Sequence, residues 1–151
     1  MAKFVFYMES ILQIKQKLED QAKVEYSNQM AKLRLEEEKL ERLRLRRDAL
    51  QQRLTEQVSA VLDLLRIRQL EDGVENIKYN MNIQRVVIMN QQKQVDQARE
   101  KLNEAMKERK TYEKLKENAF EEFKKEVNAE EQKEINELVS FRFGHSLERE
   151  G

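Results

Sequence analysis

The sequence has no proline, no cysteine and no tryptophan, and only three of its 151 residues are glycine. Because helix breakers are almost absent, nothing local prevents long uninterrupted helices. The absence of cysteine excludes disulfides and thiolate metal sites and is consistent with a reducing compartment. No apolar run approaches the roughly 20 residues needed to span a bilayer, and the first ten residues lack the apolar core of a signal peptide. We therefore expect a soluble cytoplasmic protein without a transmembrane segment.

The chain also has no excess of either charge, because its 29 basic and 29 acidic side chains cancel. No overall field favours nucleic acid or an anionic membrane, and we expect neither as a partner. Charged residues make up 38% of the chain and apolar residues 39%, which is typical of long exposed helices rather than of a compact α/β domain. The apolar residues are spaced periodically, which argues against disorder.

In the C-terminal half, apolar residues recur mainly at steps of three and four, the spacing of one face of an α-helix. They are Val95, Ala98, Leu102, Ala105, Tyr112, Leu115, Ala119, Phe123 and Val127. A helix with so narrow an apolar stripe needs one long partner helix lying along it, which is the arrangement of a coiled coil.

The N-terminal half supplies a partner of this kind. Its stripe consists of Ile11, Ile14, Leu18, Ala22, Tyr26, Met30, Leu33, Leu40, Leu43, Leu50 and Leu54. Four-residue steps from Ile14 to Met30 depart from strict heptads and predict a locally straighter supercoil. A capping box formed by Ser10 and Gln13 predicts where this helix begins, and a start one turn earlier is the alternative.

The two stripes predict an all-α fold in which two long helices of one chain form an antiparallel coiled-coil hairpin. We expect a single domain over residues 1–151, with a first arm at 8–54, a tip and chain reversal at 55–70, a second arm at 71–140 and a tail at 141–151. Thr55 or Ser59 is a candidate cap for the second helix, Gly73 is the other candidate for the break, and the tip has room for a short extra helix. The hairpin is expected to be monomeric alone; a homodimer of straight helices is the alternative.

The residues needed for catalysis or metal binding do not form a recognisable set. His145 is the only histidine, and the sequence has no glycine-rich phosphate loop and no nucleophile elbow. Consecutive glutamates such as Glu36, Glu37 and Glu38 spread around a helix instead of converging on one ion. We expect no enzyme activity, no cofactor and no metal.

Two charge clusters and four phenylalanines remain to be explained. Arginine is in excess over residues 42–53 and glutamate over residues 117–137; either the charges are dispersed for solubility, or they contact charged partners. In a hairpin, Phe4, Phe6, Phe141 and Phe143 would meet at the open end, as a plug over the seam or as a hydrophobic patch for another protein. Val86–Met89 exceeds the width of one seam, so it packs on residues 58–70 or binds a partner.

Several segments resemble the family of the flagellar export protein FliJ. They are Phe4–Phe6, Ile11-Leu12, Lys15–Glu19, Leu62–Arg66 with Ile77 and Met81, Met106–Lys110, Glu113–Lys116, and Glu131–Glu137 with Arg142-Phe143. The resemblance covers nearly the whole chain. It implies a two-helix antiparallel coiled coil similar to the central stalk subunit of rotary ATPases, at the cytoplasmic face of the membrane at the flagellar base.

The resemblance also implies partners: the hexameric flagellar export ATPase, the export gate protein FlhA and the export chaperones. By the stalk analogy, the end that bears the termini would contact the ATPase through Phe4, Phe6, Leu12, Leu18, Leu138 and Phe143. The gate contact would fall on Gly73, Val74, Ile77, Met81 and Gln84, where Gly73 replaces an aromatic of the family and shifts the contact toward Val74. The expected function is a non-enzymatic coupling rod for export. The injectisome counterpart, a generic homodimeric coiled coil and a prefoldin-like holdase are the alternatives.

Overall fold

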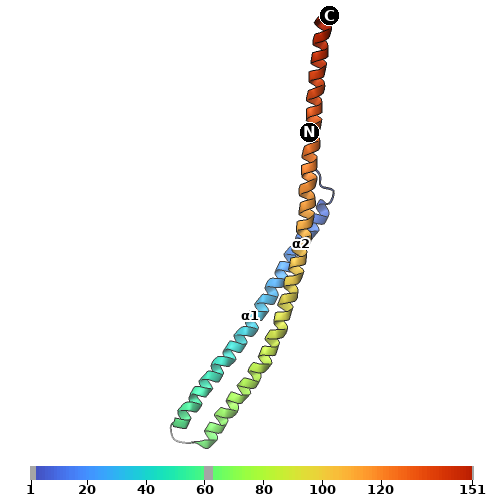
Figure 1. Ribbon diagram of the computed structural model, residues 1–151. Helices are drawn as coiled ribbons and strands as arrows, with labels where there is room; N and C mark the ends of the chain where they lie inside the picture. The colour runs from blue at the N-terminus through green and yellow to red at the C-terminus, as the bar shows by residue number, and fades with distance from the viewer. Residues whose placement is uncertain (1–2, 60–62, 151) are drawn as a thin grey trace. The chain divides into compact units, whose positions relative to one another are not determined.

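The computed structural model describes residues 3–59 and 63–150. These residues form two α-helices, α1 (Glu9–Ser59) and α2 (Leu64–Glu150), and contain no strand. The helices run in opposite directions and pack against each other (Figure 1). The predicted all-α helical hairpin is therefore confirmed, whereas the described residues contain no short third helix near the reversal.

Both helices begin at residues other than the predicted caps. The first helix starts at Glu9, after a turn in which the Glu9 amide donates to the Phe6 carbonyl over 3.1 Å. Ser10 consequently lies inside the first turn of α1 and does not cap it. The Leu12 amide donates to the Met8 carbonyl, so the helical hydrogen bonds of α1 already begin at this turn.

The second helix is capped by Asp63. The Oδ1 atom of Asp63 accepts a hydrogen bond from the Arg66 amide over 3.3 Å, the usual role of an N-cap carboxylate. The candidate caps Thr55 and Ser59 instead belong to α1, where the Thr55 hydroxyl donates to the Gln51 carbonyl. At the other end, α2 continues to Glu150, through most of the segment predicted to be a tail.

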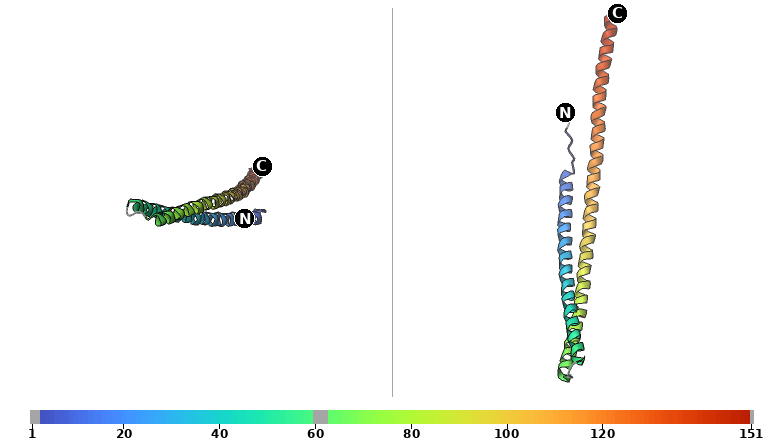
Figure 2. Two further views of the ribbon diagram at one scale, coloured as in Figure 1. Left: turned by 90° about the horizontal axis from the view of Figure 1, so that it is seen from below. Right: turned by 90° about the vertical axis from the view of Figure 1, so that its left-hand side faces the viewer.

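The chain forms two compact units. We call residues Asp20–Glu104 the turn unit, and Met1–Glu19 with Ala105–Gly151 the terminal unit. In the turn unit, α1 and α2 lie side by side, as Figures 1 and 2 show from different directions.

The seam of the turn unit follows a strict heptad pattern on both helices. On α2, the residues of the seam are buried or half-buried and follow one another at alternating steps of three and four. They are Ile67, Leu70, Val74, Ile77, Met81, Gln84, Ile88, Gln91, Val95, Ala98 and Leu102. On α1, the matching residues are Ala22, Tyr26, Gln29, Leu33, Glu36, Leu40, Leu43, Arg47, Leu50, Leu54 and Gln57. This is coiled-coil packing with two polar layers inside it.

The polar layers consist of two glutamines of α2 that reach across to α1. Gln84 Nε2 donates to the carbonyl oxygen of Glu36 over 2.8 Å and to its carboxylate over 2.6 Å. One heptad along, Gln91 Nε2 donates to the carbonyl oxygen of Gln29 over 3.0 Å and to its side chain over 2.7 Å. A slip of the helices would separate these half-buried amides from the side chains of Glu36 and Gln29, so the two layers favour this register.

The predicted run of four-residue steps from Ile14 to Met30 is wrong. The seam of α1 instead continues in heptads into the terminal unit through Leu12, Lys15 and Glu19. The reason is that α2 supplies partners for both charges, as described below, so polar residues occupy the seam. Ile14 and Leu18 are left exposed on the surface of α1.

Candidate protein-contact surfaces

The N-terminal segment of the terminal unit folds onto α2 through its phenylalanines. The ring of Phe4 lies 5.1 Å from the ring of Phe120 and 5.4 Å from that of Phe123. Phe6 and Leu12 are almost completely buried. Of the two interpretations of these phenylalanines, the structure favours the plug for Phe4, which is half-buried, and for Phe6, which is buried. Phe4 packs on Phe120 and Phe123, whereas Phe141 and Phe143 are exposed, so the prediction that all four phenylalanines meet is wrong.

A buried ion pair crosses the terminal unit. The carboxylate of Glu19, which is only 5% exposed, accepts hydrogen bonds from Nε and Nη2 of Arg109, and Arg109 Nη1 also donates to Glu113 over 2.8 Å. The hydrogen bonds to Glu19, and then those to Glu113, raise the pKa of the Arg109 guanidinium. The pair places a charge where a coiled coil normally has an apolar residue, so it specifies which residues of the two helices face each other.

Two further ion pairs flank this one. Lys15 Nζ lies 2.8 Å from a carboxylate oxygen of Glu108, and Lys116 Nζ lies 2.8 Å from one of Glu9. The hydrogen bond to Glu108 raises the pKa of Lys15. These pairs are more exposed than the Glu19–Arg109 pair, and screening by salt weakens them accordingly.

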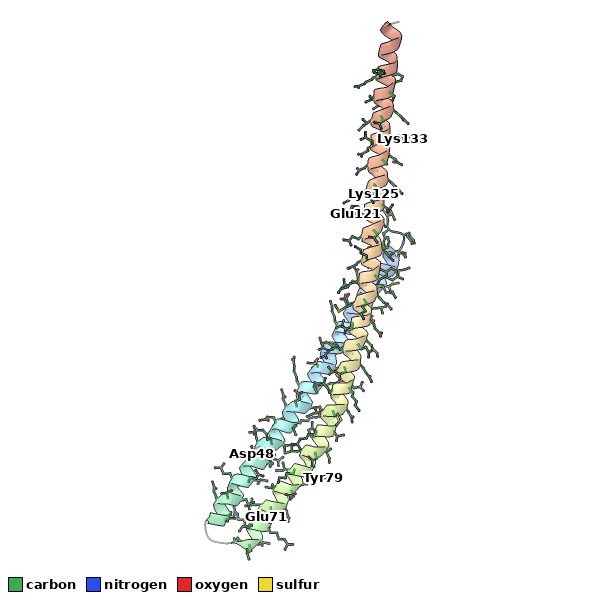
Figure 3. All side chains as sticks on the ribbon, viewed as in Figure 1. Asp48, Glu71, Tyr79, Glu121, Lys125 and Lys133 are labelled. Carbon is green, nitrogen blue, oxygen red and sulfur yellow. The ribbon has the colours of Figure 1, made fainter. Side chains whose placement is uncertain are left out.

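The C-terminal part of α2 presents an uncovered apolar face. Every residue of the range 128–144 is exposed, and Figure 3 shows no second helix beside this stretch at Lys133. The large apolar side chains here, which we call the C-terminal face, are Ile135, Leu138, Val139, Phe141 and Phe143. Two ATPase-contact candidates, Leu138 at 60% and Phe143 at 67% exposure, lie on it.

A second exposed apolar surface of the terminal unit lies on α1. Ile11, Ile14 and Leu18 follow one another at steps of three and four, beside the seam but outside it. Leu18, the remaining ATPase-contact candidate, is 43% exposed. The six candidates thus divide into three exposed residues and three that hold the N-terminal segment in place.

The gate-contact candidates lie in the seam of the turn unit. Val74, Ile77 and Met81 are all more than nine-tenths buried against α1, and Gln84 bonds to Glu36. Gly73 faces Leu50, whose Cδ1 atom would lie 3.3 Å from a β-carbon built at Gly73. These five residues therefore contact α1 and do not form a surface, because their spacing is that of the heptad seam itself.

The outward face of α2 in the same unit carries a different apolar set. Tyr79, labelled in Figure 3, is 64% exposed, and Ile83 and Val86 follow it at steps of four and three. We call these three residues the outer stripe; the neighbouring Val87 and Met89 are exposed as well. Val86–Met89 is therefore not packed on residues 58–70, and only Ile88 faces the seam. The density of apolar residues around Val86 was the sequence signal for this surface.

The described residues contain no group of three histidine, aspartate or glutamate side chains arranged to hold a metal ion. Within the same residues, neither helix has an apolar stretch that could cross a membrane. The surfaces that remain as candidates are the C-terminal face, the exposed residues of α1 and the outer stripe.

One of the three comparisons with known proteins gave a match. The sequence model of the family described as "Flagellar FliJ protein" matches residues 5–148, nearly the whole chain. No curated protein and no solved structure matched the chain.

Proposed function

Because this chain belongs to the FliJ family, whose members are non-catalytic components of the flagellar export apparatus, we propose that it couples the export ATPase to the export gate. In this proposal the chain promotes assembly of the ATPase hexamer and links it to the gate protein FlhA and to export chaperones. It works at the cytoplasmic face of the membrane at the flagellar base. The family match supports the flagellar system over an injectisome counterpart.

The observation that carries the proposal is the C-terminal face. An amphipathic helix in water normally covers its large apolar side chains, and helices in proteins gain most of their stability from packing. Here five large apolar residues over nine positions are uncovered in the terminal unit. We propose that the ATPase covers them and that Leu138 and Phe143 make direct contact. We propose that Leu18 makes a further contact with the ATPase from α1.

The buried candidates have a different role in this proposal. Phe4, Phe6 and Leu12 hold the N-terminal segment against α2 and so shape the end of the terminal unit. Their replacement would disturb ATPase binding indirectly, through loss of packing. Replacement of Leu138 or Phe143 would disturb binding directly and leave the unit folded.

The experiment that tests the ATPase contact measures hexamer formation and ATP hydrolysis of the cognate export ATPase with the full chain. We expect the chain to promote both, and L138A/F143A to lose most of this effect. The matched control is V24A, which removes an exposed apolar side chain of α1 in the turn unit. Absence of binding by the unchanged chain, or equal losses in V24A and L138A/F143A, would contradict the proposal.

For the gate, we propose the outer stripe instead of the buried candidates. An aromatic residue followed by aliphatic residues at steps of four and three gives a continuous apolar line along a helix, a common form of helix-mediated recognition. In a binding assay with the cytoplasmic domain of FlhA, Y79A/I83A is expected to weaken binding. L35A, a similarly exposed position on α1, is the control. Unchanged binding by Y79A/I83A would remove the outer stripe from the proposal without affecting the ATPase contact.

A further inference from the structure

The C-terminal face includes a shallow groove with a distinctive lining. Glu134, Glu137, Leu138 and Phe141 line it together. Among the described residues, neither glutamate makes an ion pair. The groove thus combines two unneutralised carboxylates with an aliphatic and an aromatic side chain. The segment that fits this lining is a helix that presents an aliphatic side chain flanked by cations.

The chain itself carries such a segment in the turn unit. Leu45 is 54% exposed on α1, and Arg42 and Arg46 lie beside it, one turn before and one residue after. Within the described part of the chain, Arg42 and Arg46 make no ion pair. Their neighbour Arg44 is held by Glu41 and Asp48 instead.

We propose that this Leu45 segment docks in the groove of a second copy of the chain. If α1 of one copy runs antiparallel to α2 of the other, Leu45 lies on Leu138 when Arg46 lies at the level of Glu137. The same alignment brings Arg42 to Phe141, where a guanidinium stacks favourably on an aromatic ring. One register therefore satisfies the aliphatic contact, an ion pair and a cation–π contact together.

Each copy carries both the segment and the groove. Two copies can exchange them reciprocally, or successive copies can continue the contact. Because Leu138 also belongs to the proposed ATPase contact, self-association and ATPase binding exclude each other. The inference itself concerns the chain alone and does not depend on the proposed function.

The test is sedimentation velocity of the full chain over a wide range of protein concentration, at low and at high salt. We expect the mass to rise above that of one chain with concentration, and to rise less at high salt because exposed ion pairs are screened. R42E/R46E and E134K/E137K should each weaken self-association about tenfold or more. An equimolar mixture of the two variants should restore it, since the reversed charges again complement each other.

Two further variants keep the test decisive. K107E/K110E changes the net charge by the same amount as R42E/R46E at exposed positions of α2 and should associate like the unchanged chain. L45D alters one exposed side chain and should weaken association even if the charge reversals disturb folding, which circular dichroism checks. The inference is overturned if the chain stays monomeric at every concentration. It is also overturned if the reversed variants associate as well as the unchanged chain, or if their mixture does not recover.

Discussion

Ile77→Ala and Ile83→Ala remove the same three carbon atoms from α2, six residues apart, but from different faces of the helix. Ile77 is 6% exposed and faces α1 in the seam, whereas Ile83 is 47% exposed in the outer stripe. The two variants therefore share the change in helix propensity and differ only in what surrounds the side chain. A comparison of their free energies of unfolding therefore tests which face of α2 forms the seam.

The expected magnitudes follow from burial. At about 0.8 kcal/mol per buried carbon, Ile77→Ala loses about 2.4 kcal/mol of burial, at the low end of the range for core truncations because a two-helix seam collapses readily. Alanine returns about 0.4 kcal/mol of helix propensity, which leaves a loss of about 2 kcal/mol. Ile83 loses about half the burial for the same return, so its net cost is about 0.8 kcal/mol.

Thermal and urea unfolding followed by far-ultraviolet circular dichroism separate the two outcomes. For a chain of this size, about 2 kcal/mol lowers the unfolding midpoint by about 4–8 °C, and about 0.8 kcal/mol lowers it by about 2–3 °C. The order should reverse in binding to FlhA, where Ile83→Ala is the damaging change. Equal costs in unfolding, or a larger cost for Ile83→Ala, would refute the placement of the seam.

Three other predictions concern single features of the hairpin. Gly73→Ala should stabilise the chain by up to about 1 kcal/mol, because only a movable leucine methyl group lies against the new β-carbon. The control is Gly144→Ala, whose new β-carbon would contact no other atom. A lowered urea midpoint for Gly73→Ala alone would show that the methyl group cannot move. The hydrogen bond from Gln84, and then that from Lys39, lowers the pKa of Glu36 below its ordinary 4.5. The ionised carboxylate of Glu36 therefore stabilises the folded chain fully above its ordinary pKa, and this stabilisation is lost as the pH falls through the lowered pKa. The difference in unfolding midpoint between the unchanged chain and Glu36→Gln should therefore shrink on acidification, and a constant difference would contradict this. Gln84→Leu with Gln91→Leu should raise the unfolding midpoint but broaden distances between spin labels on the two helices, because the register is no longer fixed; a single sharp distance would contradict the role of the two layers.

The hairpin could be predicted from the sequence because its main signal is periodic and repeated over many turns. The stripe of α2 was predicted correctly for most of its length, because this information lies within one helix. A few misplaced residues do not obscure a pattern of this length.

The seam at the start of α1 could not be predicted in this way. Ile11, Ile14 and Leu18 form the more apolar stripe, yet the seam runs through Lys15 and Glu19. The choice is decided by Arg109 and Glu108, which lie about 90 positions further along the chain. Local hydrophobicity carries no information about such partners.

The same limit explains the gate-contact candidates. The resemblance assigned this contact to Gly73, Val74, Ile77, Met81 and Gln84. Val74, Ile77 and Met81 have the spacing of the seam. The outer stripe has similar spacing but begins at Tyr79, two residues out of phase with Ile77. Two apolar sets so close in sequence are distinguished only when the position of the partner helix is known.

The polar layers impose unequal constraints on the two helices. In each layer one of the acceptors is a main-chain carbonyl, of Glu36 or of Gln29, and every amino acid provides that oxygen. Substitution at positions 29 and 36 therefore preserves half of each link, whereas the donating amides at 84 and 91 have no main-chain substitute. Sequence drift should accumulate on the α1 side of these layers while α2 retains its glutamines, so one helix acts as the template against which the other varies.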